Sequence, residues 1–291
     1  MSETGRRARV VGLGLCVRDE VLLVDELGLE EQHVRYRRRL SLPGGMVANA
    51  LVTAATEGVE AHLLSLVGRD QDGRFVLSEL RRRGVVTRRV VRSEDHVTTT
   101  SVVLVEKSTG ERRFIVPDRR VMEREAPEFD VASIRNSTVL MIDGHFPAEA
   151  RRAMKKAREC GAAVVADFSD ARQAFQRLLP QVDYPVVPMD FIRGYGAGSV
   201  RDTLRALHRR HGGTPVATLG EKGALAFHAG RFLEIAPVRA RVVDTTGAGD
   251  AFHGAFAAGL ARGLEVPAAL ARAARCAAAA CRHLGGVAPA D

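Results

Sequence analysis

The sequence of 291 residues has no tryptophan and only three tyrosines. Proteins that bind single-stranded nucleic acids commonly stack bases on aromatic side chains, so this shortage argues against that class. The chain is nevertheless basic, with a formal net charge of +8 and a pI near 9.9. Its arginine runs, at 37–39, 81–83 and 88–89, are scattered and are not interleaved with aromatic residues. We therefore expect no nucleic-acid partner, and the positive field favours an anionic substrate such as a nucleotide.

Long hydrophobic runs and paired cysteines are also missing. No stretch of the sequence approaches the roughly 20 apolar residues that a membrane span requires, so we expect no membrane association. The N-terminal stretch MSETGRRARVVGLGL has no cleavage-type segment, and we interpret it as the start of a cytoplasmic protein. The cysteines have neither CxxC pairing nor metal-ligand spacing, which predicts reduced thiols in the core. They are Cys16, Cys160, Cys276 and Cys281.

The chain alternates short β-type runs with helical stretches. The runs at 8–17, 61–68 and 137–144 predict strands, and the stretches at 44–58 and 72–84 predict helices. Alternating units of this kind imply a mainly parallel sheet covered by helices on both faces. Ligands of such sheets bind beyond the carboxyl ends of the strands.

Two segments, 20–42 and 98–118, interrupt this alternation with β-type residues and no helix. We expect them to form a small separate sheet, a lid over an α/β core. That core would comprise residues 1–19, 43–97 and 119–291. Because such a sheet has an apolar face and exposed edges, a substrate or a second subunit would cover it. The sequence thus favours a homodimer formed through the lid.

The stretch VVDTTGAGDAFHGAFAAGL, at 242–260, is the clearest candidate site. Gly247 and Gly249 permit backbone conformations that other residues avoid. The N–H groups at the start of the following helix would form a concavity for an anion. Asp250 could there accept the proton of a hydroxyl whose oxygen attacks phosphorus. The alternative is that Asp250 only caps the helix and that the glycines only make a tight loop.

This stretch resembles the Asp-Thr-x-Gly-Ala-Gly-Asp signature of the ribokinase-like (PfkB) carbohydrate kinases, and the resemblance extends over almost the whole chain. It implies an α/β fold, a three-layer α/β/α sandwich with a mainly parallel central sheet and a small β-sheet lid. It also implies that Asp250 is the catalytic base and that the turn before it is the anion hole. The turn residues are Gly247, Ala248 and Gly249.

Other motifs of the family supply a substrate site. The stretch LPGGMVANAL is similar to the Gly-Gly-x-x-x-Asn element that contacts sugar hydroxyls. Asp19 fits the place of a carboxylate that grips two hydroxyls, although it could also be a solvated residue at a strand end. Some fructose-type relatives carry an arginine and an acidic residue near the substrate. The resemblance therefore implies a substrate site made of Gly44, Gly45, Asn49, Asp19, Arg113 and Asp143.

The stretch VATLGEKGALAF resembles the family segment along which ATP lies, and implies contacts from Thr218, Gly220, Lys222 and Gly223. The Asn-x-x-Glu motif that organises Mg²⁺ in many relatives is missing here. Met189 and Ile192 stand at its positions, and Asp190 is the one acidic residue nearby. Mg²⁺ would then be held by ATP and water. The family's monovalent-cation site would lie beside Asp244 and Thr246.

The expected function is an ATP-dependent kinase that phosphorylates a primary hydroxyl of a small sugar. One alternative is a nucleoside kinase of the same family, which the few lid aromatics, Tyr36 and Phe114, do not favour. A catalytically silent sugar or nucleotide sensor is the other. The altered magnesium motif favours a sensor, whereas the intact Asp250 argues against one.

Overall fold

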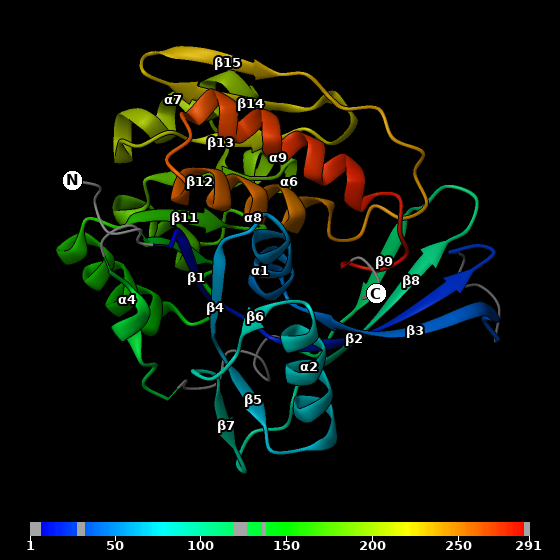
Figure 1. Ribbon diagram of the computed structural model, residues 1–291. Helices are drawn as coiled ribbons and strands as arrows, with labels where there is room; N and C mark the ends of the chain where they lie inside the picture. Colours follow the sequence, from blue (N-terminus) through cyan, green and yellow to red (C-terminus); the bar gives the residue numbers. More distant parts are fainter. Residues whose placement is uncertain (1–6, 28–32, 119–126, 136–137, 288–291) are drawn as a thin grey trace.

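The computed structural model describes residues 7–27, 33–118, 127–135 and 138–287. A sheet of nine strands forms its centre (Figure 1). Neighbouring strands are parallel from β13 to β6, and β14 and β15 add an antiparallel hairpin at one edge. The order across the sheet is β15 (Arg231–Ile235), β14 (Ala224–His228), β13 (Val216–Thr218), β12 (Tyr184–Val187), β11 (Ala163–Asp167), β10 (Thr138–Ile142), β1 (Arg9–Leu13), β4 (Glu60–Leu64) and β6 (Val85–Val86).

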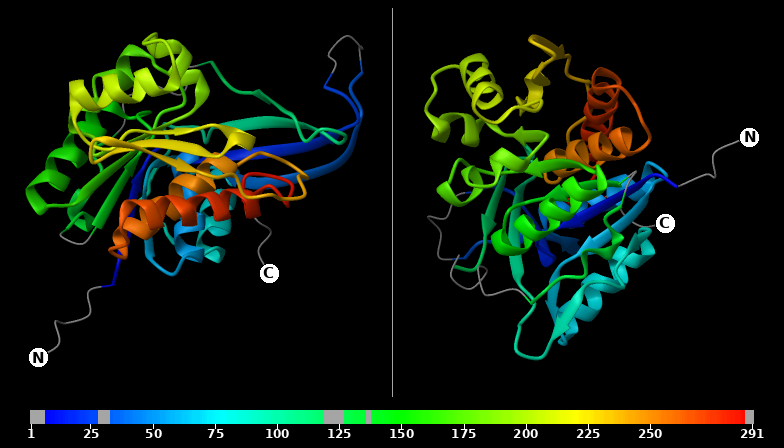
Figure 2. Two further views of the ribbon diagram at one scale, coloured as in Figure 1. Left: turned by 90° about the horizontal axis from the view of Figure 1, so that it is seen from above. Right: turned by 90° about the vertical axis from the view of Figure 1, so that its left-hand side faces the viewer.

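Helices cover both faces of this sheet, as the two views of Figure 2 show. Side chains alternate along β1, so that Val10 packs in one hydrophobic cluster while Val11 and Leu13 pack in the other. The first cluster includes α1 (Met46–Thr56), α2 (Gln71–Arg82), α8 (Ala248–Ala261) and α9 (Val266–Ala280). The second includes α4 (Pro147–Cys160), α5 (Gln173–Gln176), α6 (Met189–Tyr195) and α7 (Val200–His211). The expected α/β/α sandwich is confirmed.

Small residues let α1 and α8 pack against each other closely. A Cβ atom on Gly254 of α8 would lie 2.0 Å from the carbonyl oxygen of Ala50 in α1, so only glycine fits there. On the sheet side, a Cβ atom on Gly12 would lie 2.4 Å from Cγ1 of Val47. This close packing brings the N-terminal turns of the two helices side by side.

The two interrupting segments meet in a second sheet, which projects from the body of the molecule in Figure 1. Its order is β3 (Tyr36–Gly44), β2 (Val17–Val24), β8 (Thr100–Glu106) and β9 (Arg112–Ile115). The pair β2–β8 is parallel and the other two pairs are antiparallel. The separate small sheet is thus confirmed. Two further strands, β5 (Leu66–Gly68) and β7 (Val91–Ser93), pair by themselves.

The predicted strands at 8–17 and 61–68 are each wrong in extent, because each is divided between two sheets. The first becomes β1 and β2, and the second becomes β4 and β5. The chain leaves the large sheet at Gly14, where a Cβ atom would lie 2.2 Å from Oδ2 of Asp143. That same oxygen accepts a hydrogen bond from the Leu15 N–H. Asp19, expected at the exit of the first core strand, consequently lies inside β2 of the small sheet.

All four cysteines are free thiols, as predicted, but only Cys16 is fully buried. Cys160, Cys276 and Cys281 are half-buried at the ends of helices, so the expectation of core positions is wrong for three of them. Within the described ranges, no helix has both the length and the apolar character that crossing a membrane demands.

Candidate active site

Asp250 lies in the first turn of α8. The helix begins at Ala248 and is preceded by Gly247, whose φ of 75° is left-handed and whose Cβ would lie 2.1 Å from the Gly286 carbonyl oxygen. The residue at the cap is therefore Gly247, and the alternative interpretation of Asp250 as the capping residue is wrong. The Asn49 side chain donates a hydrogen bond of 2.9 Å to Oδ2 of Asp250.

The surroundings of Asp250 make its carboxyl group unusually basic. Burial raises its pKa to about 7, and the carboxylate of Asp167 adds to the increase. The hydrogen bond from Asn49 and the charge of His253 act in the opposite direction. A carboxylate with this pKa can accept a proton near neutral pH.

The turn in front of Asp250 is open on one side. Gly249 is exposed, and a Cβ atom there would meet nothing within 4 Å. The first N–H groups of an α-helix have no partner inside the helix and carry partial positive charge. The backbone at Ala248 and Gly249 can therefore receive an anionic group that approaches from this open side.

A second carboxylate, Asp19, lies close enough to raise the pKa of Asp250 further. It is 7% exposed, and its Oδ1 accepts a hydrogen bond from the Ser101 hydroxyl of the neighbouring strand β8. Burial raises the pKa of Asp19, while the hydrogen bond from Ser101 lowers it. On the other side, a Cβ atom on Gly44 would lie 2.1 Å from Oδ2 of Asp19. Glycine at this position thus leaves room for the carboxylate.

Gly45 and Asn49 complete this part of the site. Gly45 caps α1 with a φ of 103°, and a Cβ atom there would lie 2.3 Å from the Leu15 carbonyl oxygen. One turn later, the Asn49 amide donates to Asp250, but its Oδ1 is buried with no hydrogen-bond partner among the described residues. Buried acceptors are seldom left unsatisfied, so this oxygen is suited to a hydroxyl group of a ligand.

The C-terminal glycines are site residues that we did not anticipate from the sequence. A Cβ atom on Gly286 would lie 2.7 Å from Nδ2 of Asn49, and the Gly286 carbonyl oxygen abuts Gly247. Gly285 has a φ of 94° and contacts the lid at Leu42. Two consecutive glycines near the end of an α/β chain are a weak signal, and only the folded structure reveals their neighbours.

Asp244 holds the loop in front of α8 in place. It is fully buried, and its Oδ1 accepts hydrogen bonds from the N–H (2.8 Å) and the hydroxyl (2.7 Å) of Thr246. Its Oδ2 accepts a hydrogen bond of 2.7 Å from the Gly285 N–H. Both oxygens are thus occupied by protein donors. The side chains of Asp244 and Thr246 therefore fit a monovalent cation poorly.

Arg112, rather than Arg113, points toward the signature loop. The Arg112 guanidinium donates a hydrogen bond to the Thr245 hydroxyl. In the antiparallel register of β8 and β9, Arg112 lies opposite Val105 and Arg113 lies opposite Leu104. The two arginines therefore occupy opposite faces of the small sheet.

The pairing of β2 with β8 also shows which face of the small sheet carries the site residues. Asp19 lies opposite Ser101 on the neighbouring strand, and Ser101 and Val105 share a face because they are four residues apart. Asp19 and Arg112 are accordingly on one face of the lid. The structure does not bring Arg113 to the other predicted site residues.

Asp143 is buried at the carboxyl end of β10, but both of its oxygens serve the backbone. Oδ2 accepts from the Leu15 N–H at 2.8 Å and Oδ1 accepts from the His145 N–H at 3.0 Å. The carboxylate thereby joins the exits of β1 and β10. Asp143 therefore lies beside the site, and each of its two oxygens already accepts a hydrogen bond from the protein.

The residues expected along ATP lie at the end of β13. The Thr218 hydroxyl faces the Val187 carbonyl oxygen of β12 at 3.5 Å, and a short 3-10 helix, η3 (Gly220–Lys222), follows. Gly223 has a φ of 84°, and its Cβ would lie 2.1 Å from the Ile235 carbonyl oxygen. Gly220, with a φ of 61°, and Lys222 are exposed. These residues lie at the same edge of the sheet as Asp250, because the carboxyl ends of parallel strands all lie at one edge.

The altered magnesium motif contributes no acidic group to this edge. Ile192 is buried, Met189 is half-buried, and Asp190 is exposed and paired with Arg193. Among the described residues there is no cluster of three His, Cys, Asp or Glu side chains that could hold a metal ion. The side chains at this edge thus do not fit a protein-bound Mg²⁺.

A profile of the pfkB family of carbohydrate kinases matches residues 7–291. The chain belongs to this family. It is an ATP-dependent carbohydrate kinase, in agreement with its named relatives. The kinase is 29% identical to fructoselysine 6-kinase of Escherichia coli over 253 residues, which cover 83% of this chain and 90% of the relative. It is 24% identical to mouse ketohexokinase over 274 residues, 90% of this chain and 92% of the relative.

Solved structures agree on the fold of the kinase. Arabidopsis thaliana ribokinase complexed with ribose and ATP superposes with a TM-score of 0.78 at 22% identity, covering 96% of this chain and 94% of that one. Adenosine kinase from Sinorhizobium meliloti superposes with a TM-score of 0.80 at 19% identity, covering 97% and 96%. At such identities the likeness shows the ribokinase fold alone.

Proposed function

We propose that this kinase transfers the γ-phosphate of ATP to a primary hydroxyl of a small sugar. Asp250 takes the proton of the hydroxyl as its oxygen attacks phosphorus. The backbone of Gly247, Ala248 and Gly249 stabilises the negative charge of the transferring group. One observation carries the proposal: a carboxylate with a pKa of about 7 lies in the first turn of a helix, beside an open glycine turn.

The sugar is held by the groups around Asp19. Its carboxylate accepts hydrogen bonds from two hydroxyls, and Oδ1 of Asn49 accepts a third. Gly44 leaves room for the Asp19 carboxylate, and we place the backbone of Gly44 and Gly45 beside the sugar. The unpartnered oxygen of Asn49 supports this arrangement. Because the relatives named above include a ketohexokinase and a fructoselysine kinase, we propose a ketose or ketose derivative as the substrate.

ATP lies along the end of β13, between Thr218 and the turn at Gly220 and Gly223, with Lys222 near its phosphates. It brings Mg²⁺ with it, and the metal supplies charge neutralisation of the triphosphate. Arg112 faces the same space from the lid and is suited to the transferring phosphoryl group because its guanidinium binds phosphate oxygens in a planar fork. Closure of the lid excludes water, which limits hydrolysis of ATP.

ADP release by the purified protein tests this function directly. The acceptors are a panel of ketoses, aldoses, sugar acids and nucleosides, with Mg²⁺ and ATP present throughout. We expect turnover with a ketose and none with the nucleosides. Turnover with nucleosides alone would show that the acceptor is a nucleoside and not a sugar. Binding of ATP without turnover on any acceptor would favour a sensor.

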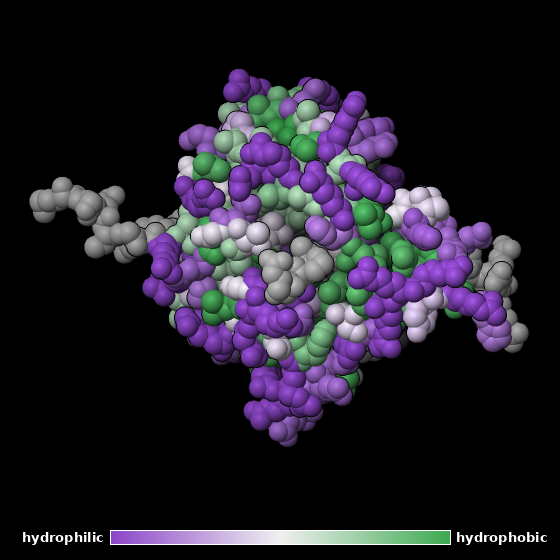
Figure 3. All heavy atoms as spheres, turned by 45° about the vertical axis from the view of Figure 1, so that its right-hand side comes forward, coloured by the Kyte–Doolittle hydropathy of each residue, from purple (hydrophilic) through white to green (hydrophobic). Residues whose placement is uncertain are grey.

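We also propose that two copies associate through the lid. The exposed large hydrophobic residues include Tyr36 on β3 and 114–116 on and after β9. Figure 3 shows hydrophobic side chains gathered where the small sheet meets the body of the molecule. Light scattering should give the mass of a dimer, and a charged residue in place of Ile115 should weaken it. A monomer at all concentrations would contradict this association.

A further inference from the structure

Beneath the proposed base lies a buried histidine that the proposed reaction does not use. His253 belongs to α8 and is 3% exposed. Its Nδ1 lies 2.7 Å from the carbonyl oxygen of Gly249, and its Nε2 lies 3.2 Å from the carbonyl oxygen of Val186 in β12. Both neighbours are hydrogen-bond acceptors.

This geometry bears on the protonation state of the ring. A neutral imidazole has one N–H group and one nitrogen lone pair. With two carbonyl oxygens as neighbours, the lone pair would face an acceptor and lose a hydrogen bond in a site closed to water, which is costly. An imidazolium has two N–H groups and satisfies both contacts. The two carbonyl oxygens therefore favour the charged ring.

A counter-charge is present beside the ring. Oδ2 of Asp167, at the carboxyl end of β11, lies 3.4 Å from Nδ1 of His253. Asp167 is 5% exposed, and within the described part of the chain this oxygen has no hydrogen-bond partner. Burial raises the pKa of Asp167, and the charge of His253 lowers it. A buried charge is tolerated when an opposite charge accompanies it, so an imidazolium at His253 stabilises the ionised form of this carboxylate.

We infer that His253 is held as an imidazolium and acts as a positioning residue for Asp250, joining the first turn of α8 to the ends of β11 and β12. Its contact with the Gly249 carbonyl fixes the peptide next to the base. Its charge offsets Asp167, which would otherwise hinder ionisation of Asp250. This role rests on the proposed function of Asp250, whereas the charge of the ring does not.

The charges around His253 show why a cation is needed here. Asp250 lies three residues before it on α8, and Asp167 faces it from β11. Further titratable groups surround this pair, and most of them are carboxylates. They are Asp143 and His145 after β10, and Asp19 on β2. Carboxylates at short range raise each other's pKa, so a site without the imidazolium would hold a proton on Asp250 more tightly.

Nitrogen-15 NMR of the full-length kinase tests the charge itself. The protein is labelled at its nine histidines, and His253 is assigned by the resonances that disappear in His253→Gln. We expect both ring nitrogens to carry a proton at neutral pH. A single N–H at neutral pH would overturn the inference. The wild-type measurement needs no variant to be active.

Two variants separate this inference from the function of Asp250. In Asp167→Asn the counter-charge is gone, and we expect only one ring nitrogen of His253 to carry a proton at neutral pH. In Asp250→Asn we expect it to stay doubly protonated. If Asp250→Asn kept full turnover, the proposed base would be wrong while the state of His253 would still stand. A His253 that stays charged without Asp167 would overturn the pairing.

Kinetics test the positioning role. His253→Gln retains a donor but no charge, and we expect kcat to fall about tenfold while KM for sugar and for ATP stay within about twofold. The matched control is His208→Gln on α7, because the Nδ1 of His208 also lies 2.8 Å from a carbonyl oxygen, that of Gly213, but the ring is remote from Asp250. That control should leave kcat unchanged. An unchanged kcat in His253→Gln would contradict the role.

Discussion

At the scale of single residues, the two glycines of the anion-hole turn differ in what they tolerate. Gly247 needs its left-handed φ and has a carbonyl oxygen where a Cβ would lie, whereas Gly249 faces open space. Gly247→Ala should therefore lower stability by about 1–3 kcal/mol. Gly249→Ala should keep its melting temperature but lose about 10²-fold in kcat, because its methyl group meets the phosphoryl group.

Thermal unfolding and kcat, measured on both variants, check this contrast. A Gly249→Ala enzyme with wild-type kcat would show that nothing approaches the turn. Unchanged stability in Gly247→Ala would show that the turn can be made by an ordinary residue. Either result would remove one half of the argument for the anion hole.

The pH dependence of turnover follows from the raised pKa of Asp250. A general base acts in its ionised form, so kcat should rise with pH and level off above about pH 7. An unperturbed aspartate would give a rise near pH 4 instead. Measurement of kcat from about pH 5 to pH 9 decides between these two midpoints, and a midpoint near 4 would contradict the burial of the base.

At the scale of elements, the lid strand β9 presents two adjacent arginines to different surroundings. Arg112 bonds Thr245 of the signature loop, and Arg113 lies on the other face of the sheet. Arg112→Ala should lower kcat/KM about 10²-fold, since it removes a charged contact to the phosphoryl group. Arg113→Ala is the matched control and should stay within about threefold of wild type. Equal losses in both variants would contradict this assignment of faces.

The same two arginines show what the sequence of a strand can predict and what it cannot. The strand itself was predictable from β-type residues and a turn signal, but the face of each arginine depends on its register with β8. A shift of one residue exchanges Arg112 and Arg113, and nothing local to the strand determines the shift. The sequence predicts Arg113 as the lid arginine of the site, whereas in the structure its neighbour Arg112 is the one that bonds the signature loop.

The run at 8–17 shows a second limit. It contains two glycines, Gly12 and Gly14, among β-type residues, and nothing in the local pattern tells which of them ends the strand. The break comes from Asp143, which is more than a hundred residues away and bonds the Leu15 N–H. His253 illustrates the same point, because its partners lie on two distant strands. By contrast, the glycine signature and the helices that follow strands were predictable because their signals are local.

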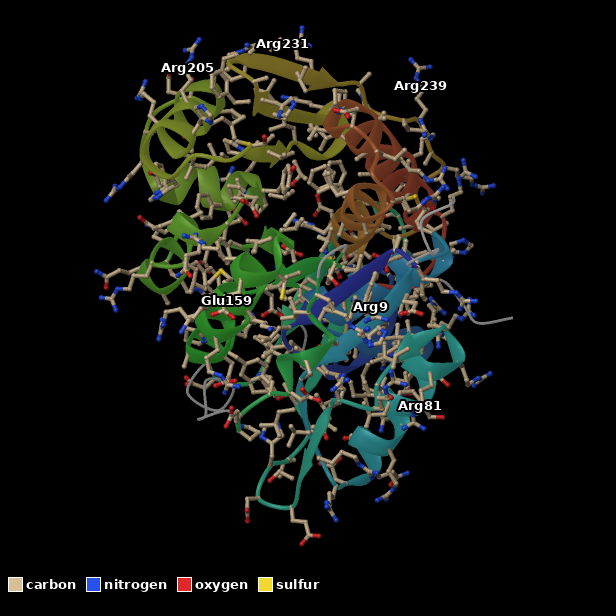
Figure 4. All side chains as sticks on the ribbon, turned by 60° about the vertical axis from the view of Figure 1, so that its left-hand side comes forward. Arg9, Arg81, Glu159, Arg205, Arg231 and Arg239 are labelled. Carbon is tan, nitrogen blue, oxygen red and sulfur yellow. The ribbon has the colours of Figure 1, made fainter. Side chains whose placement is uncertain are left out.

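At the scale of the whole molecule, the surface charge is distributed over many elements. In Figure 4, Arg205 of α7, Arg231 of β15 and Arg239 of the following loop all point away from the body. Several of the arginines are also paired, for example Arg201 with Glu234 and Arg37 with Asp25. Exposed pairs of this kind contribute little to stability.

Ionisation of Asp250 lowers the stability of the folded protein, and this effect can be measured. The pKa of Asp250 rises from 3.8 in its ordinary state to about 7 in the fold, so the folded state binds this proton more tightly than the unfolded state. This tighter proton binding adds to the free energy of unfolding. The added stability is fully present below about pH 4 and is lost as pH rises through about 7. Asp250→Asn carries no charge at any of these pH values and avoids the loss.

We therefore expect Asp250→Asn to be more stable than wild type at pH 8 by about 1 kcal/mol, a figure reduced for the partial exposure of the group. For a chain of this size the melting temperature would rise by roughly 2 °C. At pH 4 the two proteins should unfold at nearly the same temperature. A variant that is less stable than wild type at pH 8 would show that ionising this half-buried carboxylate costs no stability.

The most direct measurement is kcat of Asp250→Asn with a sugar that the wild type phosphorylates, together with the affinity for ATP. If Asp250 is the base, kcat falls by about 10²–10⁴-fold, the typical contribution of general-base catalysis, and ATP binds with nearly unchanged affinity. If kcat stays within about threefold of wild type, another group accepts the proton and the proposed mechanism is wrong.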